Sequence, residues 1–170
     1  AANLKSDYSK WLGEVTSKGL NPEPIQLGHY NVRYTDFPAH ESTLINNLKF
    51  AGEMGWANDW VEQWTSDSDM MQWPVTIVES GAYQATILYV CGDHEVGTQF
   101  RLACQDNNLD FQIKQAHNKE LVNCPDRVKR DEVDKVNWGE QYVGDINLQK
   151  GRGLISLIYK DDKASDIGIK

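Results

Sequence analysis

Hydrophobic and polar residues alternate with a period of two in most segments after residue 70. This pattern is typical of strands that bury one face and expose the other. It predicts strands at residues 71–79, 82–91, 98–104, 109–115, 141–148, 154–160 and 166–170, with weaker candidates at residues 31–35 and 43–50. Turn-forming pairs such as Ser80-Gly81 and Asn107-Asn108 separate them at short intervals. We therefore predict an all-β fold, an antiparallel two-sheet β-sandwich of the jelly-roll type.

The same alternation assigns side chains to the faces of individual strands. Trp73 lies on an apolar face of the strand at residues 71–79, and we expect this face in the core. In the strand at residues 82–91, one face is shared by Tyr83, Ile87, Tyr89 and Cys91. Leu88 and Val90 point the other way, because successive side chains of a strand alternate between its two faces. A slip of one residue in the strand register would exchange the two sets.

The first 20 residues follow a different pattern. Apolar side chains recur at helical spacing, at Tyr8, Trp11, Leu12 and Val15, and Gly19 is a suitable helix stop. The sequence thus predicts one short N-terminal helix, over residues 4–18. We expect residues 1–170 to form a single β-sandwich domain, in which residues 1–20 are either a helical strap over one sheet or a connection to an upstream domain.

The charge of the chain narrows the range of partners. There are 25 acidic residues against 17 Lys and Arg, which gives a formal net charge of −8 at pH 7. Such a balance argues against non-specific binding to nucleic acid or to an anionic membrane surface. The longest apolar runs are also far too short to cross a membrane. We therefore expect neither nucleic acid nor a membrane as a partner.

Three cysteines, Cys91, Cys104 and Cys124, allow one disulfide and leave one thiol over. Cys91 and Cys104 end neighbouring predicted strands, so they could form a bridge or could pack as small hydrophobic residues. None of the three belongs to a CxxC pair, which argues against a zinc knuckle. We expect no cofactor, although carboxylates near Asp93 and Asp166 could hold a structural calcium ion.

No familiar catalytic motif is present in the chain. The segment CPDR at residues 124–127 lacks one residue of the C/S-x-P-x-R motif that sulfatases convert to formylglycine. A GxSxG elbow, an HExxH helix and a glycine-rich phosphate loop are also absent. His94, between Asp93 and Glu95, is the best single candidate for acid–base work, but a solvated loop between two strands is the better explanation. We therefore expect that the chain is not an enzyme.

Residues 56–64 give the strongest indication of binding. Three tryptophans occur in this short segment, Trp56, Trp60 and Trp64, and Asn58 lies among them. Indole rings stack on the C–H faces of sugar rings, while polar side chains hydrogen-bond the hydroxyl groups. Tryptophans are also highly buried on average, so the same residues could belong to the core. The periodicity of the segment is too weak to separate these interpretations. The predicted site rests on the interpretation in which the three tryptophans are exposed.

Basic residues gather between residues 114 and 135, where strand periodicity is weak. Long loops in compact domains are often functional, and an Arg guanidinium matches the oxygens of a sulfate group. Acidic residues nearly cancel the charge of this stretch, so a solvated, self-paired loop is the alternative. We predict that it meets the 56–64 loop at one edge of the sandwich. The predicted ligand-binding residues are Trp56, Asn58, Trp60, Trp64, His117, Arg127, Lys129 and Arg130.

An ordered set of short segments runs through nearly the whole chain. They include PEPIQLG at residues 22–28, FPAHES at 37–42, ANDWVEQWTSDSD at 57–69, GAYQATILYVC at 81–91, PDRVKR at 125–130 and LQKGRGLISLIYK at 148–160. This set resembles the non-catalytic β-sandwich region of secreted bacterial polysaccharide sulfatases. It is more distantly similar to family 6 carbohydrate-binding modules.

The resemblance implies a non-catalytic carbohydrate-binding module. Such a module would hold a covalently linked sulfatase or other glycan-degrading enzyme on a sulfated or otherwise anionic marine polysaccharide. It would be secreted, periplasmic or attached to the cell surface. The chain lacks the sulfatase active-site motif, so sulfatase activity does not carry over to it. The alternative is a structural accessory domain of a sulfatase with no ligand of its own.

Overall fold

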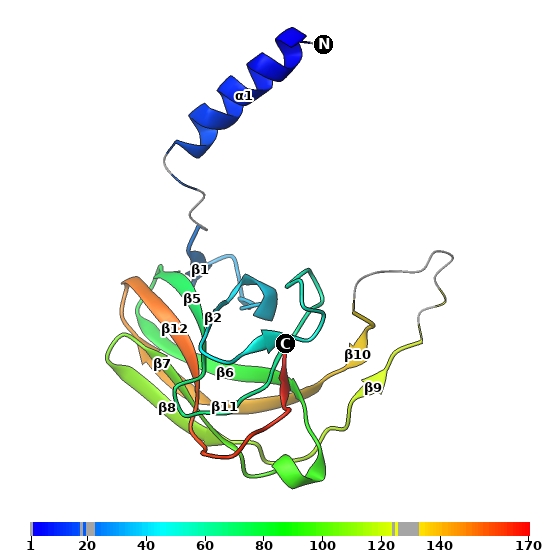
Figure 1. Cartoon of the computed structure of the whole chain (residues 1–170). Helices are drawn as coiled ribbons and strands as arrows, with labels where there is room; N and C mark the ends of the chain where they lie inside the picture. Colours follow the sequence, from blue (N-terminus) through cyan, green and yellow to red (C-terminus); the bar gives the residue numbers. More distant parts are fainter. Residues whose placement is uncertain (1, 18, 20–22, 124, 126–132) are drawn as a thin grey trace.

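The computed structural model of the chain describes residues 2–17, 19, 23–123, 125 and 133–170. Its strands form two main antiparallel sheets, and one helix stands outside them (Figure 1). The predicted all-β sandwich with an N-terminal helix is therefore confirmed. Within the described residues, no helix is long and apolar enough to span a membrane.

The first sheet has six strands in the order β1-β5-β12-β7-β8, with β2 paired to β5 as well. All pairs are antiparallel except β1 with β5. Its strands are β1 (Ile25–Leu27), β2 (Thr43–Ile45), β5 (Met70–Ile77), β7 (Gln99–Cys104), β8 (Asn107–Gln112) and β12 (Gly151–Tyr159). The last four coincide, within a few residues, with strands that the alternation predicts.

The second sheet has five strands in the order β11-β6-β13-β4-β3. Its strands are β3 (Lys49–Phe50), β4 (Val61–Glu62), β6 (Gly81–Val90), β11 (Gly139–Leu148) and β13 (Gly168–Ile169). The predicted faces of β6 are confirmed, because Tyr83, Ile87 and Tyr89 pack in the main core. Leu88 is exposed, and Val90 belongs to a separate small cluster on the outer face.

A short hairpin forms a separate two-stranded sheet and packs on the outer side of the second sheet. It consists of β9 (Glu120–Leu121) and β10 (Val136–Asn137), which pair antiparallel and lie at the right in Figure 1. The hairpin belongs to the long connection between β8 and β11. Strand β9 therefore lies in the basic segment at residues 114–135 that the sequence assigns to a loop, and β10 follows this segment directly.

Two early strand predictions need correction. Residues 31–35 form turns and bends, and no strand is assigned there. The predicted strand at residues 43–50 is two strands, β2 and β3, which belong to different sheets. Between them, Asn46 adopts a positive φ of 66° and donates to the carbonyl of Ser68. This turn redirects the chain from the first sheet to the second.

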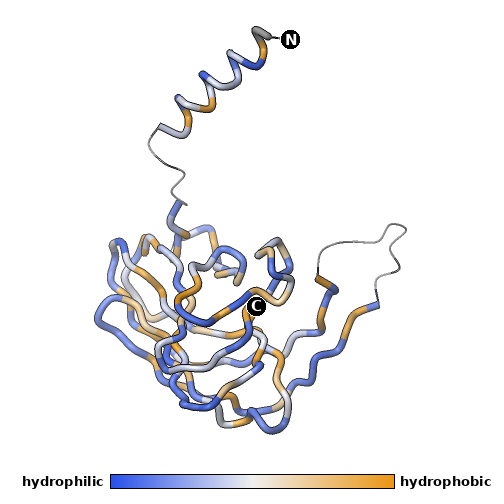
Figure 2. Tube along the Cα trace, viewed as in Figure 1, coloured by the Kyte–Doolittle hydropathy of each residue, from blue (hydrophilic) through white to orange (hydrophobic). Residues whose placement is uncertain are grey.

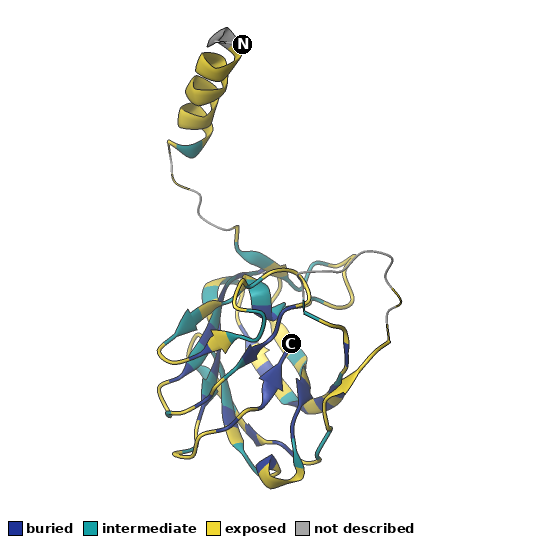
Figure 3. Cartoon of the chain, turned by 45° about the vertical axis from the view of Figure 1, so that its right-hand side comes forward, coloured by how far each residue is buried: buried dark blue, intermediate teal, exposed yellow. Residues whose placement is uncertain are grey.

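Helix α1 (Ala2–Thr16) lies close to its predicted range and stands clear of both sheets in Figures 1 and 3. Gly19 is confirmed as the helix stop, since its φ is 82° and its N–H donates to the carbonyl of Thr16. The apolar side chains of α1 form an exposed stripe: Leu4, Tyr8, Trp11, Leu12 and Val15.

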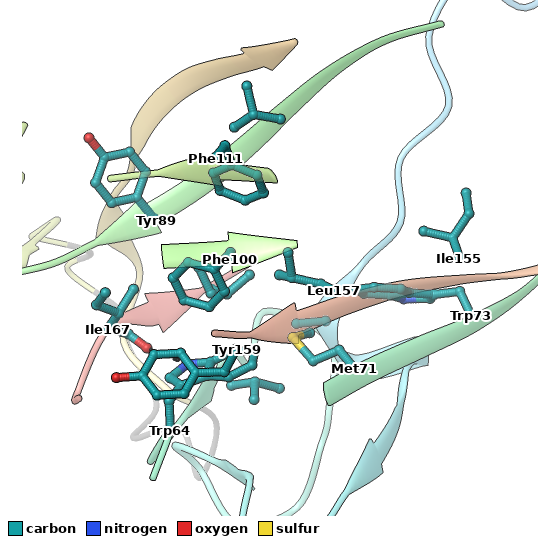
Figure 4. Packing of buried hydrophobic residues seen from close by; sticks show 14 of the residues in the cluster. Trp64, Met71, Trp73, Tyr89, Phe100, Phe111, Ile155, Leu157, Tyr159 and Ile167 are labelled. Carbon is teal, nitrogen blue, oxygen red and sulfur yellow. Dashed lines mark hydrogen bonds between the residues drawn. The ribbon is translucent and has the colours of Figure 1, made fainter. Parts of the chain in front are cut away.

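The core lies between the two sheets, where Figure 3 shows the buried segments and Figure 2 shows hydrophobic residues alternating with hydrophilic ones along the strands. Trp64 is completely buried and packs against Phe100 and Tyr159, with ring centroids 5.1 and 5.9 Å away (Figure 4). Its Nε1 donates to the carbonyl of Ile167 at 3.0 Å. Trp73 is buried as predicted.

The thiols of Cys91 and Cys104 are free and buried, so the bridge between them that the sequence allowed is not formed. Both pack as small hydrophobic residues in the main core. Burial raises the pKa of each thiol above its ordinary value. Cys124 lies outside the described residues.

Candidate functional site

The predicted loops meet on the outer face of the second sheet, next to β4 and β13. Lys119 extends its ammonium group over the indole of Trp60, with Nζ 4.4 Å from the ring centroid. Trp138 packs edge-on against the same indole at 5.7 Å. We call these three residues, together with Trp56 four positions before Trp60 in the same loop, the tryptophan corner. It joins the β3–β4 loop to the segment between β8 and β11.

Cross-strand pairing explains why Trp60 lies on this face. Ile169 of β13 pairs with Val61, so Val61 points into the core and the preceding Trp60 points outward. Gly168 leaves room for the indole, because a Cβ there would lie only 3.0 Å from Trp60 Cδ1. The indole Nε1 donates to Glu62 Oε2 at 3.1 Å. Position and tilt of the ring are therefore fixed.

A small apolar cluster buries Trp60. Val90 and Val136 are its other buried members, and Trp138, Val133 and Ala51 pack against it. Only 4% of Trp60 is exposed, so the prediction of an exposed stacking ring is wrong for this residue. The physical reason is that β10 and its neighbours cover the outer face at this point. Trp60 instead supports Lys119 and Trp138.

Asp59 determines the shape of the β3–β4 loop. Its buried carboxylate accepts hydrogen bonds from the backbone N–H groups of Gly52 and Trp60, both at 2.9 Å, and of Gly55 at 3.1 Å. Asn58 adopts a positive φ of 77°, which an Asn tolerates better than most residues. The loop is thus closed by its own carboxylate and presents its tip to solvent.

Trp56 and Asn58 are the predicted residues that this loop exposes. Trp56 is 46% exposed, and Asn58 is exposed as well. Trp64 lies in the core instead, so its prediction as a ligand-binding residue is wrong. A bridge between Trp64 and Ser165 pulls it inward, and this partner is 101 positions away along the chain (165 − 64). Nothing near Trp64 in the sequence indicates this pairing.

His117 connects the basic segment to the second sheet. Its backbone bridges that of Cys91, with N···O distances of 2.9 and 3.1 Å, and its Nε2 lies 3.0 Å from the carbonyl oxygen of Asn137. A carbonyl only accepts, so Nε2 is the donor in this contact. His117 therefore anchors the segment from which Lys119 extends.

The remaining predicted cations, Arg127, Lys129 and Arg130, lie outside the described residues. Two described cations contribute instead to the charge of the corner. Lys119 is exposed, while the half-buried Lys170 donates to the carbonyl of Asp59 at 3.2 Å. Burial lowers the pKa of Lys170 from its ordinary value, and the Coulomb attraction of Asp59 opposes this shift.

Trp138 and Lys170 were missed by sequence reasoning. Trp138 comes directly before a strand, next to Gly139, and has no aromatic neighbour in the sequence to mark it. Lys170 reaches the corner only through the pairing of β13 with β4 and β6. Lys119 was recognised as part of the basic segment but not as a site residue.

The hydrogen bonds next to His94 have a structural role. Its ring is exposed, and the neighbouring Glu95 is buried. Glu95 accepts hydrogen bonds from Gly92 N, Ser165 Oγ and Asp166 N, at 2.7 to 3.0 Å. This carboxylate links the two segments near Asp93 and Asp166 where a calcium ion was considered. Within the described part of the chain, no group of three or more His, Cys, Asp or Glu side chains could hold a metal ion.

Comparison with known proteins identifies no family. No family model matches the chain, and no curated protein matches it. Among solved structures, it resembles a GH26-CBM35 β-(1,4)-mannanase of Podospora anserina, with a TM-score of 0.52 and 10% identity. The match covers 79% of this chain and 26% of the mannanase. At this identity the similarity shows a shared fold.

Two weaker structural similarities have TM-scores below 0.5. An Arthrobacter globiformis isomalto-dextranase complexed with panose matches at 0.48 with 14% identity, over 80% of this chain and 23% of that one. The Cry4Aa toxin of Bacillus thuringiensis matches at 0.45 with 12% identity, over 74% and 20%. The chain thus spans about a quarter or less of each of these proteins.

Proposed function

We propose that the chain is a non-catalytic carbohydrate-binding module that holds a linked glycan-degrading enzyme on a sulfated or otherwise anionic polysaccharide. The observation that carries the proposal is the tryptophan corner. There a loop closed by Asp59 exposes Trp56 and Asn58, and Lys119 is positioned on Trp60 at the junction of the same two segments. The proposal includes a secreted, periplasmic or cell-surface location, because polysaccharides of this kind lie outside the cell.

Trp56 supplies the apolar part of the proposed contact. An exposed indole offers a flat face to the C–H groups of a pyranose ring, and Asn58 beside it both donates and accepts hydrogen bonds. The loop is held by three hydrogen bonds to one carboxylate. Little conformational entropy is therefore lost when a sugar binds, which favours affinity.

Lys119 supplies the charge. A cation over an indole face is stabilised by about 0.5–1 kcal/mol at an exposed site. This attraction keeps the ammonium group on the corner, where it would bind a sulfate or carboxylate of the glycan. Arg127, Lys129 and Arg130 follow in the same connection between β8 and β11 and remain part of the proposed site.

The shared fold gives additional support. The P. anserina protein combines a catalytic family with a carbohydrate-binding family in one chain, and the present chain matches about a quarter of its length. A β-sandwich of this size is thus compatible with attachment to a larger enzyme. The linked catalytic domain and the sulfated target are parts of the proposal.

Affinity electrophoresis tests the proposal. The chain is run through gels that contain carrageenan, a sulfated fucan, mannan or dextran, and we expect retardation by the sulfated polymers. Trp56→Ala should weaken binding about tenfold, which corresponds to about 1.4 kcal/mol. Lys119→Ala should weaken it and also flatten its salt dependence, because the Debye length falls to about 3 Å at 1 M salt.

Matched controls separate the site from general surface effects. Trp11→Ala removes an exposed indole from α1, and Lys163→Ala removes an exposed ammonium group between β12 and β13. Both should migrate as the parent does. If Trp56→Ala and Lys119→Ala remain folded and bind as tightly as the parent, the site lies elsewhere.

A structural accessory domain is the second candidate function. The exposed apolar stripe of α1 favours it, because five large apolar side chains in 12 residues (Leu4 to Val15) are typical of a packing surface. A parent chain that all four gels leave unretarded would support this candidate and refute the carbohydrate-binding proposal.

A further inference from the structure

A second aromatic surface lies on the segment that follows β1. Residues 28–36, which we call the tyrosine loop, carry the two most exposed large hydrophobic side chains of the described residues. Tyr30 is 81% exposed and Tyr34 is 77% exposed. Both side chains are therefore largely open to a ligand, although the hydropathy pattern predicts a strand here.

Each tyrosine ring is supported by a neighbouring side chain. The ring of His29 stacks on Tyr30, with centroids 4.7 Å apart and planes 28° apart. The guanidinium of Arg33 lies over the ring of Tyr34, with Cζ 5.6 Å from its centroid. Such contacts restrict the rings while leaving their other faces free, which lowers the entropy lost on binding.

The backbone of the tyrosine loop is also fixed. Val32 N donates to the carbonyl of His29 at 2.8 Å, and Asn31 N donates to His29 Nδ1 at 3.3 Å. At its start, Gly28 has a φ of +83°, and a Cβ there would overlap the hydroxyl group of Tyr83. Only glycine fits this position, and it seats the loop against the first residues of β6.

The tyrosine loop is separate from the tryptophan corner. Gly28 contacts Tyr83 near the start of β6, whereas Trp60 packs on Gly168, which pairs with Val90 at the end of β6. Tyr83 and Val90 are seven positions apart along the extended strand, which corresponds to about 23 Å. A single sugar ring cannot contact both surfaces, but a polysaccharide chain can.

We propose that the tyrosine loop is a second carbohydrate-binding site, which takes a pyranose ring of the same polysaccharide. This inference rests on the proposed function in one respect, which is that the ligand is a polysaccharide. Tyrosine rings join an apolar face to a hydrogen-bonding hydroxyl group, and Asn31, Arg33 and Asp36 add exposed polar groups around them. This mixture fits a hydroxyl-rich ring better than an aliphatic protein surface. Two sites on one polymer give avidity.

Affinity electrophoresis in carrageenan tests the second site. The double variant Tyr30→Ala/Tyr34→Ala should bind the polymer at least about tenfold more weakly than the parent, because avidity is lost. Its affinity for a carrageenan disaccharide at the tryptophan corner, measured by the change in tryptophan fluorescence, should be unchanged. Tyr8→Ala, which removes an exposed tyrosine from α1, is the matched control and should bind as the parent does.

The outcomes separate this inference from the proposed function. A double variant with parental affinity for the polymer, alongside a weakened Trp56→Ala, would overturn the second site and leave the proposed function standing. A weakened double variant alongside an unchanged Trp56→Ala would support the tyrosine loop and reject the corner. A parent that does not bind the polymer would reject both.

Chemical footprinting provides a measurement that needs no variant. Tetranitromethane nitrates exposed tyrosines, and mass spectrometry of the peptides locates the modified residues. We expect saturating carrageenan to protect Tyr30 and Tyr34 at least threefold while Tyr8 reacts at its free rate. Equal nitration of Tyr30 and Tyr34 with and without a bound polymer would refute the proposal.

Discussion

Asp59→Asn is the most informative single change in this protein. In the structure, Oδ1 of Asp59 accepts from Gly52 N and Trp60 N, and Oδ2 accepts from Gly55 N. An asparagine can keep its carbonyl oxygen in the place of Oδ1. Its amide group would then replace Oδ2 and face the N–H of Gly55, so two donors would oppose each other.

The expected loss follows from these three contacts. Hydrogen bonds to a charged group contribute about 1.5–3 kcal/mol each, and neutral ones about 1 kcal/mol. Asparagine would keep two neutral bonds, lose the third and leave Gly55 N without its acceptor. We therefore expect the free energy of unfolding to fall by at least about 2.5 kcal/mol. The tip with Trp56 and Asn58 should lose its fixed shape, and polysaccharide binding should weaken with it.

Asp69→Asn is the matched control, because Asp69 is a second buried carboxylate that braces a loop. It accepts from the backbone N–H groups of Asn47, Thr65 and Ser66, away from the tryptophan corner. Urea denaturation should show a similar loss of stability in both variants. Affinity electrophoresis should show weakened binding only for Asp59→Asn. A fully stable Asp59→Asn, or an equal loss of binding in Asp69→Asn, would refute this account of the loop.

Three further predictions concern stability. Gly168→Ala should cost about 1–3 kcal/mol in urea denaturation, since its Cβ would press on Val90 at 2.8 Å and on Trp60 at 3.0 Å, whereas Gly81→Ala meets no atom within 4 Å. Trp64→Leu should cost about 3–5 kcal/mol in the same assay without a specific effect on glycan binding, because the indole fills the core. Burial raises the pKa of Asp69, but the hydrogen bonds from Thr65, Asn47 and Ser66 together outweigh it and hold this pKa below its ordinary value. Its stabilisation is present above the unfolded pKa and is lost as pH falls through the folded one, so Asp69→Asn should lose less stability than the parent between pH 5 and pH 2.

For each of these three predictions, one result would contradict the reasoning. Equal stabilities of Gly168→Ala and Gly81→Ala would mean that Trp60 and Val90 do not pack tightly on the glycine. A stable Trp64→Leu that fails to bind glycan would return Trp64 to the binding surface. Parallel acid unfolding of Asp69→Asn and the parent would show that this carboxylate contributes no pH dependence.

The sandwich could be predicted because its strands repeat one simple pattern. In β6, every second side chain meets the core, so Tyr83, Ile87 and Tyr89 follow from periodicity alone. The same argument fails at residues 31–35, where Tyr34 and its neighbours alternate but find no strand to pair with. Alternation identifies a segment that can form a strand, whereas pairing decides whether it does.

The candidate site was only partly predictable, because long-range pairing decides which tryptophans are exposed. Trp60 owes its burial to β10 and its neighbours, and Trp64 owes its burial to the bridge with Ser165, so both depend on segments far along the chain. Asn58 and Gln63 also adopt positive φ angles, which breaks any regular alternation through the segment. The meeting of the two loops was anticipated, but the cation that crosses between them is Lys119.

The two buried thiols offer a direct measure of how often the sandwich opens. Only the thiolate reacts with alkylating reagents, and burial together with a raised pKa makes it scarce at Cys91 and Cys104 in the folded chain. In a Cys124→Ser background, the labelling rate of each remaining thiol then reports how often the structure around that thiol opens. Cys91 follows β6 in the second sheet, and Cys104 ends β7 in the first. Equal rates would mean that both sheets open together, whereas faster labelling of Cys91 would identify the sheet beneath the tryptophan corner as the weaker half.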